Sequence, residues 1–131
     1  MKRTALLHAE LSEAIARLGH GDLLVIGDAG LPIPTGPRRI DLALTANVPR
    51  FEDVLRAVLS EMKVESAVVA DLLASANPAV HAELRRQLDG TPLSTVSHDE
   101  LKLATRGAFV MVRSGECSPY ANVILKAGVV F

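Results

Sequence analysis

Three polar segments of the sequence contain side chains that could carry acid–base chemistry or bind a polar ligand. The first is Gly19-His20-Gly21-Asp22, which follows a predicted helix and precedes a predicted strand. The partial negative charge at a helix C-terminus favours the charged form of a nearby imidazole. A histidine that is partly protonated near neutral pH can donate a proton and take it back. His20 is therefore a candidate acid–base residue, although the same position suits an exposed loop histidine.

The other two segments offer hydrogen-bonding groups. Asp28 ends a predicted buried strand, a place where a charge usually has a partner or a ligand, so it could accept hydrogen bonds from ligand hydroxyls or cap the following loop. The stretch 113–122 is dense in hydroxyl, amide and charged groups, and it contains Tyr120, the only tyrosine. Asn122 offers a donor and an acceptor, which suits neighbouring hydroxyls. A polyhydroxylated ligand and an ordinary polar loop both fit this composition.

Two further candidate residues lie in the helix predicted after Ser97. His98 follows a predicted helix N-cap, where the helix dipole disfavours the charged ring, and a neutral imidazole there could exchange a hydrogen bond with a ligand. Lys102 lies four residues later on the same helix face. The two remaining histidines, His8 and His81, lie in predicted helices and are expected at the surface.

The sequence predicts no metal and no cofactor. Its four histidines lack metal-ligand spacing, and neither HExxH nor CxxC occurs. The GxGxxG and GxxxxGK[ST] phosphate-binding patterns are also absent. No signature pairs the single cysteine, Cys117, with a base, so a structural role is expected for it.

The elements that must position these side chains alternate between helices and strands. An apolar stripe of Leu7, Leu11, Ile15 and Leu18 predicts the first helix, with Gly19 at its end. Asn77-Pro78 marks a helix start, and Ser97 with Glu100 forms a capping box. Helices are predicted over 5–18, 51–62 and 78–88 and after Ser97, with a loop over 29–39 and strands over 22–28, 40–45, 66–73, 93–96, 108–112 and 122–126.

This alternation predicts an α/β fold: one three-layer domain spanning 1–131, with a mostly parallel sheet flanked by helices, Rossmann-like in outline. In such sheets ligands bind where loops diverge at the carboxyl ends of the strands. The expected site therefore lies at that edge.

The composition narrows the partners and the compartment. A net charge of -1 and 3% aromatic residues argue against a nucleic-acid partner, and no run reaches the ~20 apolar residues of a membrane helix. The hydrophobic fraction of 49% predicts a symmetric oligomer that buries apolar surface between subunits. A lone cysteine and the lack of an uninterrupted apolar leader predict a cytoplasmic protein.

Several longer motifs together resemble the D-ribose pyranase family, which is related to the fucose mutarotases. The resemblance covers nearly the whole chain. Its motifs are Arg17-Leu18-Gly19-His20, Asp28-Ala29-Gly30-Leu31-Pro32-Ile33-Pro34, Arg39-Ile40-Asp41, Glu61-Met62-Lys63-Val64-Glu65, Ser97-His98-Asp99-Glu100, Arg113-Ser114-Gly115-Glu116-Cys117-Ser118-Pro119-Tyr120-Ala121-Asn122 and Ala127-Gly128-Val129.

The resemblance implies a cofactor-independent isomerase that converts β-D-ribopyranose to β-D-ribofuranose, the form that ribokinase phosphorylates. It makes His20 the catalytic proton donor and assigns sugar binding to Asp28, His98 and Tyr120-Ala121-Asn122, with Lys102 near the pocket. It further implies a homodecamer of two stacked pentamers with sites near subunit boundaries.

Three alternatives stay open at this point. Fucose mutarotases share the histidine and the tyrosine-containing loop, so a mutarotase for fucose or another monosaccharide is the nearest. A non-catalytic sugar-binding accessory protein of ribose uptake and a purely structural ring-forming protein are the others. Ring-exchange rates on ribose and fucose distinguish a ribose enzyme from a fucose mutarotase. An accessory protein would bind ribose without faster ring exchange, and a structural protein would bind no pentose.

Overall fold

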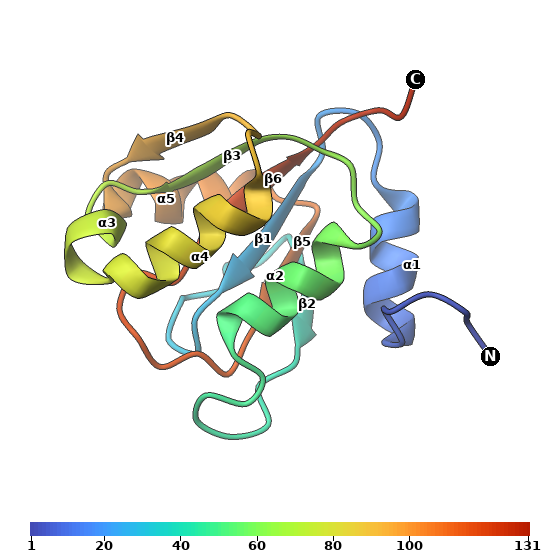
Figure 1. Cartoon of the computed structure of the whole chain (residues 1–131), viewed down its shortest axis with the longest axis horizontal. Coiled ribbons are helices and arrows are strands. Elements are labelled where there is room, and N and C mark those ends of the chain that lie inside the picture. The colour runs from blue at the N-terminus through green and yellow to red at the C-terminus, as the bar shows by residue number, and fades with distance from the viewer.

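Helices and strands alternate along nearly the whole chain, as Figure 1 shows for the computed structural model, which describes residues 1–131. None of the helices is long and apolar enough to cross a membrane. The elements are α1 Ala9–Arg17, β1 Leu23–Gly27, β2 Arg38–Asp41, α2 Phe51–Leu59, β3 Val64–Ala70, α3 Leu73–Ala76, α4 Pro78–Leu88, β4 Leu93–Val96, α5 His98–Ala104, the 3-10 turn η1 Thr105–Gly107, β5 Val110–Arg113 and β6 Val123–Ala127.

The six strands form one sheet in the order β2-β5-β1-β6-β3-β4. Pairs β2–β5, β5–β1 and β3–β4 are parallel, whereas β6 runs antiparallel to both of its neighbours, β1 and β3. The prediction of a mostly parallel sheet is confirmed. The reversal of β6 has a simple cause: residues 114–122 are too few for the helical crossover that a parallel return requires. The loop therefore stays at one edge of the sheet and passes the end of β1.

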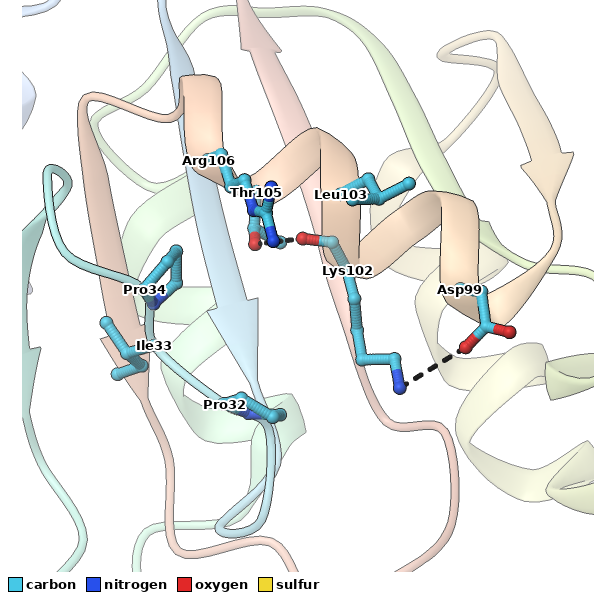
Figure 2. A pocket seen from close by; sticks show the side chains of 8 residues that line it. All are labelled: Pro32, Ile33, Pro34, Asp99, Lys102, Leu103, Thr105 and Arg106. Carbon is cyan, nitrogen blue, oxygen red and sulfur yellow. Dashed lines mark hydrogen bonds and ion pairs between the residues drawn. The ribbon is translucent and has the colours of Figure 1, made fainter.

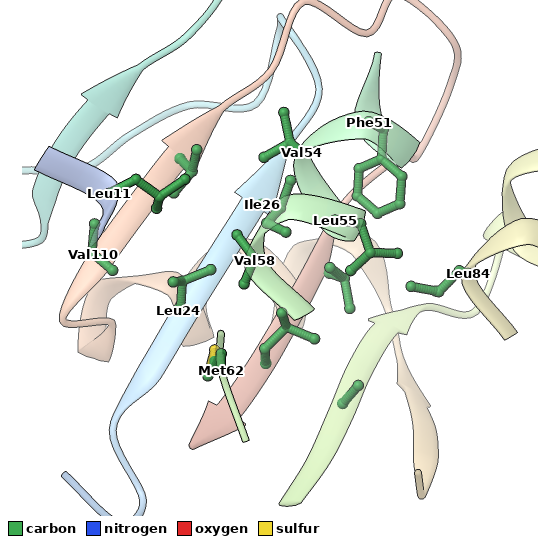
Figure 3. Packing of buried hydrophobic residues seen from close by; sticks show 14 of the residues in the cluster. Leu11, Leu24, Ile26, Phe51, Val54, Leu55, Val58, Met62, Leu84 and Val110 are labelled. Carbon is green, nitrogen blue, oxygen red and sulfur yellow. The ribbon is translucent and has the colours of Figure 1, made fainter. Parts of the chain in front are cut away.

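Helices cover both faces of the sheet, which gives the predicted three layers (Figure 1). The larger core has 22 buried residues and lies under α1, α2 and α4. Its members include Leu24 and Ile26 of β1, Leu11, Phe51 and Leu84 (Figure 3). The smaller core has 7 buried residues and lies on the other face, under Leu101 of α5 and Leu31 of the long loop. The second face therefore depends on one short helix and one loop.

The first helix differs from its prediction at both ends. It begins at Ala9 rather than residue 5, because the His8 ring caps it by accepting the Leu11 amide, and Leu6 rather than Leu7 enters the core. The helix ends at Arg17, and Leu18 is already extended. Gly19 directly follows this cap, yet the left-handed backbone of the turn falls on Gly21, with φ 89°.

The remaining boundaries agree with the sequence to within a few residues. The predicted start of α4 at Asn77-Pro78, the span of β4 and the capping box of α5 are confirmed. The strand predicted over 66–73 is shorter at its end, because α3 replaces its last residues. Four other predicted elements exist with shifted bounds: the strands over 40–45, 108–112 and 122–126 and the helix over 51–62.

Candidate functional site

Asp28 lies directly after β1, at the edge of the sheet where the parallel strands end. Its carboxylate is half-buried and accepts two hydrogen bonds, from the Gly30 amide (2.9 Å to Oδ1) and from the Asn122 side chain (3.0 Å to Oδ2). A carboxylate has about four acceptor positions. Asp28 is therefore fixed in orientation and retains free acceptor capacity for a ligand.

Asn122 completes this contact from the other direction. Its Oδ1 accepts the backbone N–H of Asp28 at 2.8 Å, and the residue is 1% exposed. Because β6 is antiparallel to β1, the residue before β6 lies beside the residue after β1. The reversal of β6 thus brings positions 94 residues apart in sequence into a reciprocal pair of hydrogen bonds.

His98 and Tyr120 form the adjoining aromatic part of the site. Their rings meet edge to face, with centroids 5.1 Å apart. His98 is the first residue of α5, held there by the capping box, and its buried Nδ1 has no hydrogen-bond partner within the chain. Tyr120 adopts a left-handed backbone conformation, with φ 57°. Ala121 next to it is fully buried.

Lys102 lines a cavity of ≈ 480 Å³ that lies between α5 and the loop Pro32–Pro34. Its ammonium pairs with Asp99 at 3.3 Å, and Figure 2 shows the side chain extended across the cavity from Pro32. Residues i and i+4 share a helix face. Lys102 therefore lies on the same side of α5 as His98.

A second hollow, of ≈ 410 Å³, borders Asp28 directly. It is lined by the Asp28–Gly30 turn and by residues 116–119. Among them Glu116 is 4% exposed; its Oε1 accepts the Ser118 hydroxyl at 3.2 Å, and its buried Oε2 has no partner. Asp28 thus lies at a polar hollow on one side of the site.

His20 lies at the opposite edge of the sheet. It precedes β1, whereas Asp28 follows it, and its Nε2 contacts Oε1 of Glu65 at 3.1 Å. The other oxygen of Glu65 binds the ammonium of Lys126 at 2.9 Å, near the far end of β6. The Lys126 ammonium and the His20 ring hold the pKa of Glu65 below its usual value.

The structure therefore brings five of the seven residues predicted for the site to one edge of the sheet. One edge of the sheet holds Asp28, His98, Tyr120, Ala121 and Asn122, with Lys102 on the same helix as His98. His20 is absent from this group within one chain. A strand advances about 3.3 Å per residue, so the eight residues from His20 to Asp28 place the two on the order of 20 Å apart.

Several residues that shape the site were missed as functional residues by the sequence reasoning. Asn77 was predicted only as a helix cap, yet its Nδ2 also donates to the Pro119 carbonyl at 2.9 Å and to the Ser118 hydroxyl at 2.8 Å. Arg113 donates from Nε to the Ala29 carbonyl at 2.9 Å and pairs with Asp41 at 3.0 Å. The contacts of Asn77 and Arg113 join distant segments of the chain, and the only sign of them in the sequence was the concentration of polar residues over 113–122.

No group of three or more metal-ligating side chains occurs.

The chain has close relatives over its full length. Residues 1–130 match the model of the RbsD / FucU transport protein family. The chain is 59% identical over 131 residues to the D-ribose pyranase of Symbiobacterium thermophilum and 60% identical over 133 residues to that of Variovorax paradoxus, with 100% of each chain covered in both cases.

Solved structures agree with these matches. Bacillus subtilis RbsD complexed with D-ribose is similar with a TM-score of 0.96 and 40% identity, and the match covers 100% of both chains. A fucose mutarotase from Streptococcus pneumoniae in complex with L-fucose has a TM-score of 0.85 at 23% identity, also over 100% of both chains. At that identity the second likeness concerns the fold alone.

Proposed function

The chain belongs to the RbsD / FucU transport protein family, and we propose that it interconverts the pyranose and furanose ring forms of D-ribose, with His20 as the residue that transfers the proton. The observation that carries this proposal is the polar cluster at the end of β1. There an oriented carboxylate, a buried amide and an aromatic pair lie beside the hollow that Asp28 borders. A polar monosaccharide with several hydroxyls matches these groups.

Asp28 and Asn122 hold the sugar hydroxyls in this proposal. The free lone pairs of Asp28 accept from hydroxyls, and the Asn122 amide fixes the direction in which they point. His98 and Tyr120 bind the adjoining part of the sugar, Ala121 contributes backbone groups, and Lys102 bounds the pocket from α5.

The chemistry needs only proton transfer. A proton reaches the ring oxygen while the anomeric hydroxyl loses one, and the C1–ring oxygen bond breaks to give an open aldehyde. After rotation, the 4-hydroxyl attacks C1, loses its proton, and the carbonyl oxygen gains one, which closes the furanose. His20 donates the first proton, and a bound water or a polar neighbour takes the anomeric one. A positioned acid–base group typically accelerates such a step by about 10²–10⁴-fold.

His20 and Asp28 act together across a contact between two copies of the chain. The two residues lie at opposite edges of one sheet, so His20 of one copy meets the sugar cluster of its neighbour. Exposed apolar side chains supply surface for such contacts: Leu44 is 80% exposed and Leu103, which lines the Lys102 cavity, is 57% exposed. The assembly is a homo-oligomer, for which the family resemblance implies two stacked pentamers. We place it in the cytoplasm, where its free cysteine, Cys117, stays reduced.

The test is NMR exchange between the pyranose and furanose signals of D-ribose. The wild-type protein should accelerate exchange, and His20→Ala should lose about 10²–10⁴-fold of that acceleration. His81→Ala, which removes a histidine from α4, is the matched control and should keep the wild-type rate. Unchanged exchange in His20→Ala would overturn the role of His20. Ribose binding without any exchange would indicate an accessory binding protein, and faster exchange on fucose than on ribose would indicate a mutarotase.

A further inference from the structure

We propose that Glu65 is a positioning residue that holds the His20 ring by its Nε2, with Lys126 as its counter-ion, so that Nδ1 of His20 carries the transferred proton. This inference rests on the proposed function, because it assigns a partner to the proton-transferring histidine. The contact distances are 3.1 Å from His20 Nε2 to Glu65 Oε1 and 2.9 Å from Lys126 Nζ to Glu65 Oε2.

A break in the sheet directs Glu65 toward His20. The pairing of β3 with β6 shifts register between Val64 and Ser66, so Glu65 is the extra residue of a β-bulge. Bulges turn a side chain out of its regular direction and are frequent beside active sites. Gly128 permits this arrangement, since a Cβ there would lie 3.3 Å from the Cβ of Glu65 and 3.4 Å from its amide nitrogen.

The backbone of His20 is fixed separately from its ring. Asp22 accepts the Gly19 amide at 2.8 Å, its own amide donates to the Gly19 carbonyl at 3.1 Å, and Gly21 donates to the Ala127 carbonyl at 2.9 Å. The φ of 89° at Gly21 is the conformation that the third position of a type II turn requires. The turn places the Cα of His20, and among the hydrogen bonds of the chain only the one to Glu65 holds its ring.

The two nitrogens of the His20 ring have different roles in this proposal: Nε2 contacts Glu65, and Nδ1 transfers the proton. A neutral imidazole has one N–H and one lone pair. With Nε2–H directed at the Glu65 carboxylate, the lone pair falls on Nδ1, which takes up the proton and returns it. A carboxylate in this position orients the ring and stabilises the imidazolium form. The His20 ring is 57% exposed, so Nδ1 is open to a sugar held by a neighbouring copy.

The contacts around His20 predict different effects of two substitutions. Its charged neighbours are Glu65 on β3, Lys126 on β6, Asp22 in its own turn and Lys63, whose side chain lies against Gly128. Glu65→Gln removes the carboxylate that holds Nε2–H, so the neutral ring should populate both of its tautomers. Lys126→Met leaves that carboxylate against the ring and should keep the Nε2–H tautomer.

The experiment records histidine-ring ¹⁵N NMR spectra, which show which ring nitrogen carries a proton, for wild type, Glu65→Gln and Lys126→Met, beside the ribose ring-exchange assay. Glu65→Gln should lower the exchange rate about tenfold with unchanged ribose affinity, mix the two neutral tautomers of His20, and be partly rescued by Glu65→Asp. Glu61→Gln is the matched control, because Glu61 also pairs with a lysine, Lys2, without contacting His20.

The results separate this inference from the proposed function. An unchanged His20 tautomer and an unchanged exchange rate in folded Glu65→Gln would overturn the role of Glu65, even if His20→Ala is inactive. Absence of exchange in the wild type would overturn the proposed function, and the NMR spectra would still report on the Glu65–His20 pair. Thermal unfolding of each variant establishes that it is folded.

Discussion

At the scale of single residues, the site depends on a few side chains that each make two contacts. Asn122 both accepts from the Asp28 backbone and donates to its carboxylate, and Glu65 bridges His20 and Lys126 with its two oxygens. Each of these residues joins two separate segments of the chain. Substitution of Asn122 or Glu65 should therefore change the orientation of the neighbouring Asp28 or His20 side chain.

Asn122→Ala should leave the Asp28 amide unpaired and its carboxylate free to turn. Loss of a partner for a buried polar group costs about 1–3 kcal/mol, so urea denaturation should show a drop of that size, and calorimetry should show weaker ribose binding. Asn122→Asp should be worse at neutral pH, because two carboxylates then meet, and should recover as acid protonates one of them. Ser94→Ala, on the edge strand β4, is the control. Wild-type stability in both variants would contradict the structural role of Asn122.

Glu65 should also make stability depend on pH. Because its pKa is lowered in the folded state from 4.5, its contribution is fully present above pH 4.5 and is lost as the pH falls through the folded value. The stability difference between wild type and Glu65→Gln, from urea denaturation, should therefore shrink between pH 6 and pH 3. Asp71→Asn is the control, because Asp71 is exposed and lies outside the Glu65–Lys126 pair. A constant difference for Glu65→Gln would contradict the ion pair.

At the scale of elements, the loop from β5 to β6 is the part that assembles the sugar cluster. It starts beside β1, where Ser114 donates to the Gly27 carbonyl at 2.7 Å, and it ends at Asn122. Its conformation is supported from two sides, by the segment before α2 through Gly115 and by the start of α4 through Asn77. Both supports can be tested without touching a proposed ligand contact.

Gly115→Ala should disrupt the first support. A Cβ on Gly115 would lie 2.5 Å from the Val48 carbonyl oxygen, and that neighbour is backbone and cannot rotate away. Overpacking of this kind costs typically about 1–3 kcal/mol, measurable by urea denaturation, and the displaced loop should weaken ribose binding. Gly107→Ala is the matched control, since no atom lies within 4 Å of its added carbon. Equal stability of the two variants would show that the loop adapts.

The second support separates helix capping from loop anchoring. Asn77→Ala removes the cap of α4 and both donors to the loop, so it should lose about 0.5–2 kcal/mol and also ribose affinity. Asn77→Ser retains a capping oxygen and should recover most of the stability but little of the affinity, because the donor to Pro119 is still missing. Recovery of both quantities together in Asn77→Ser would show that Asn77 acts only through the helix.

At the scale of the whole molecule, the sheet separates the proposed proton donor from the proposed sugar cluster. His20 precedes β1 and Asp28 follows it. Lys126 lies near the end of β6 and Asn122 directly precedes β6, so each strand has one of these residues at each end. No rotation of a side chain closes a gap of this size. The proposed mechanism therefore requires a second copy of the chain, whose His20 reaches the sugar cluster of the first.

Subunit mixing tests this directly. His20→Ala and Asp28→Asn should each be nearly inactive in ring exchange as pure assemblies. When the two are unfolded and refolded together in equal amounts, about one quarter of the contacts should pair an intact His20 with an intact Asp28 and recover a corresponding fraction of activity. Asp28→Asn mixed with a double variant lacking both residues is the control. No recovery from the first mixture would show that each site lies within one chain.

The sequence predicted the fold class and the order of the main elements, α3 and η1 excepted, because these depend on local signals. It also supplied the candidate residues of the site. Apolar periodicity fixed the helices and strands, and Asn77-Pro78 and Ser97 to Glu100 marked two helix starts by side-chain bonds within one turn. Whole-chain motifs also identified the family before any contact was known.

Which of the candidate residues meet depends on the tertiary fold. The direction of β6 has no local signature, yet it sets Asn122 beside Asp28 and Lys126 near His20. The bulge at Glu65 exists only through pairing with β6. These features arise from contacts between distant segments, and long-range pairing is the one property that a pattern of neighbouring residues does not encode.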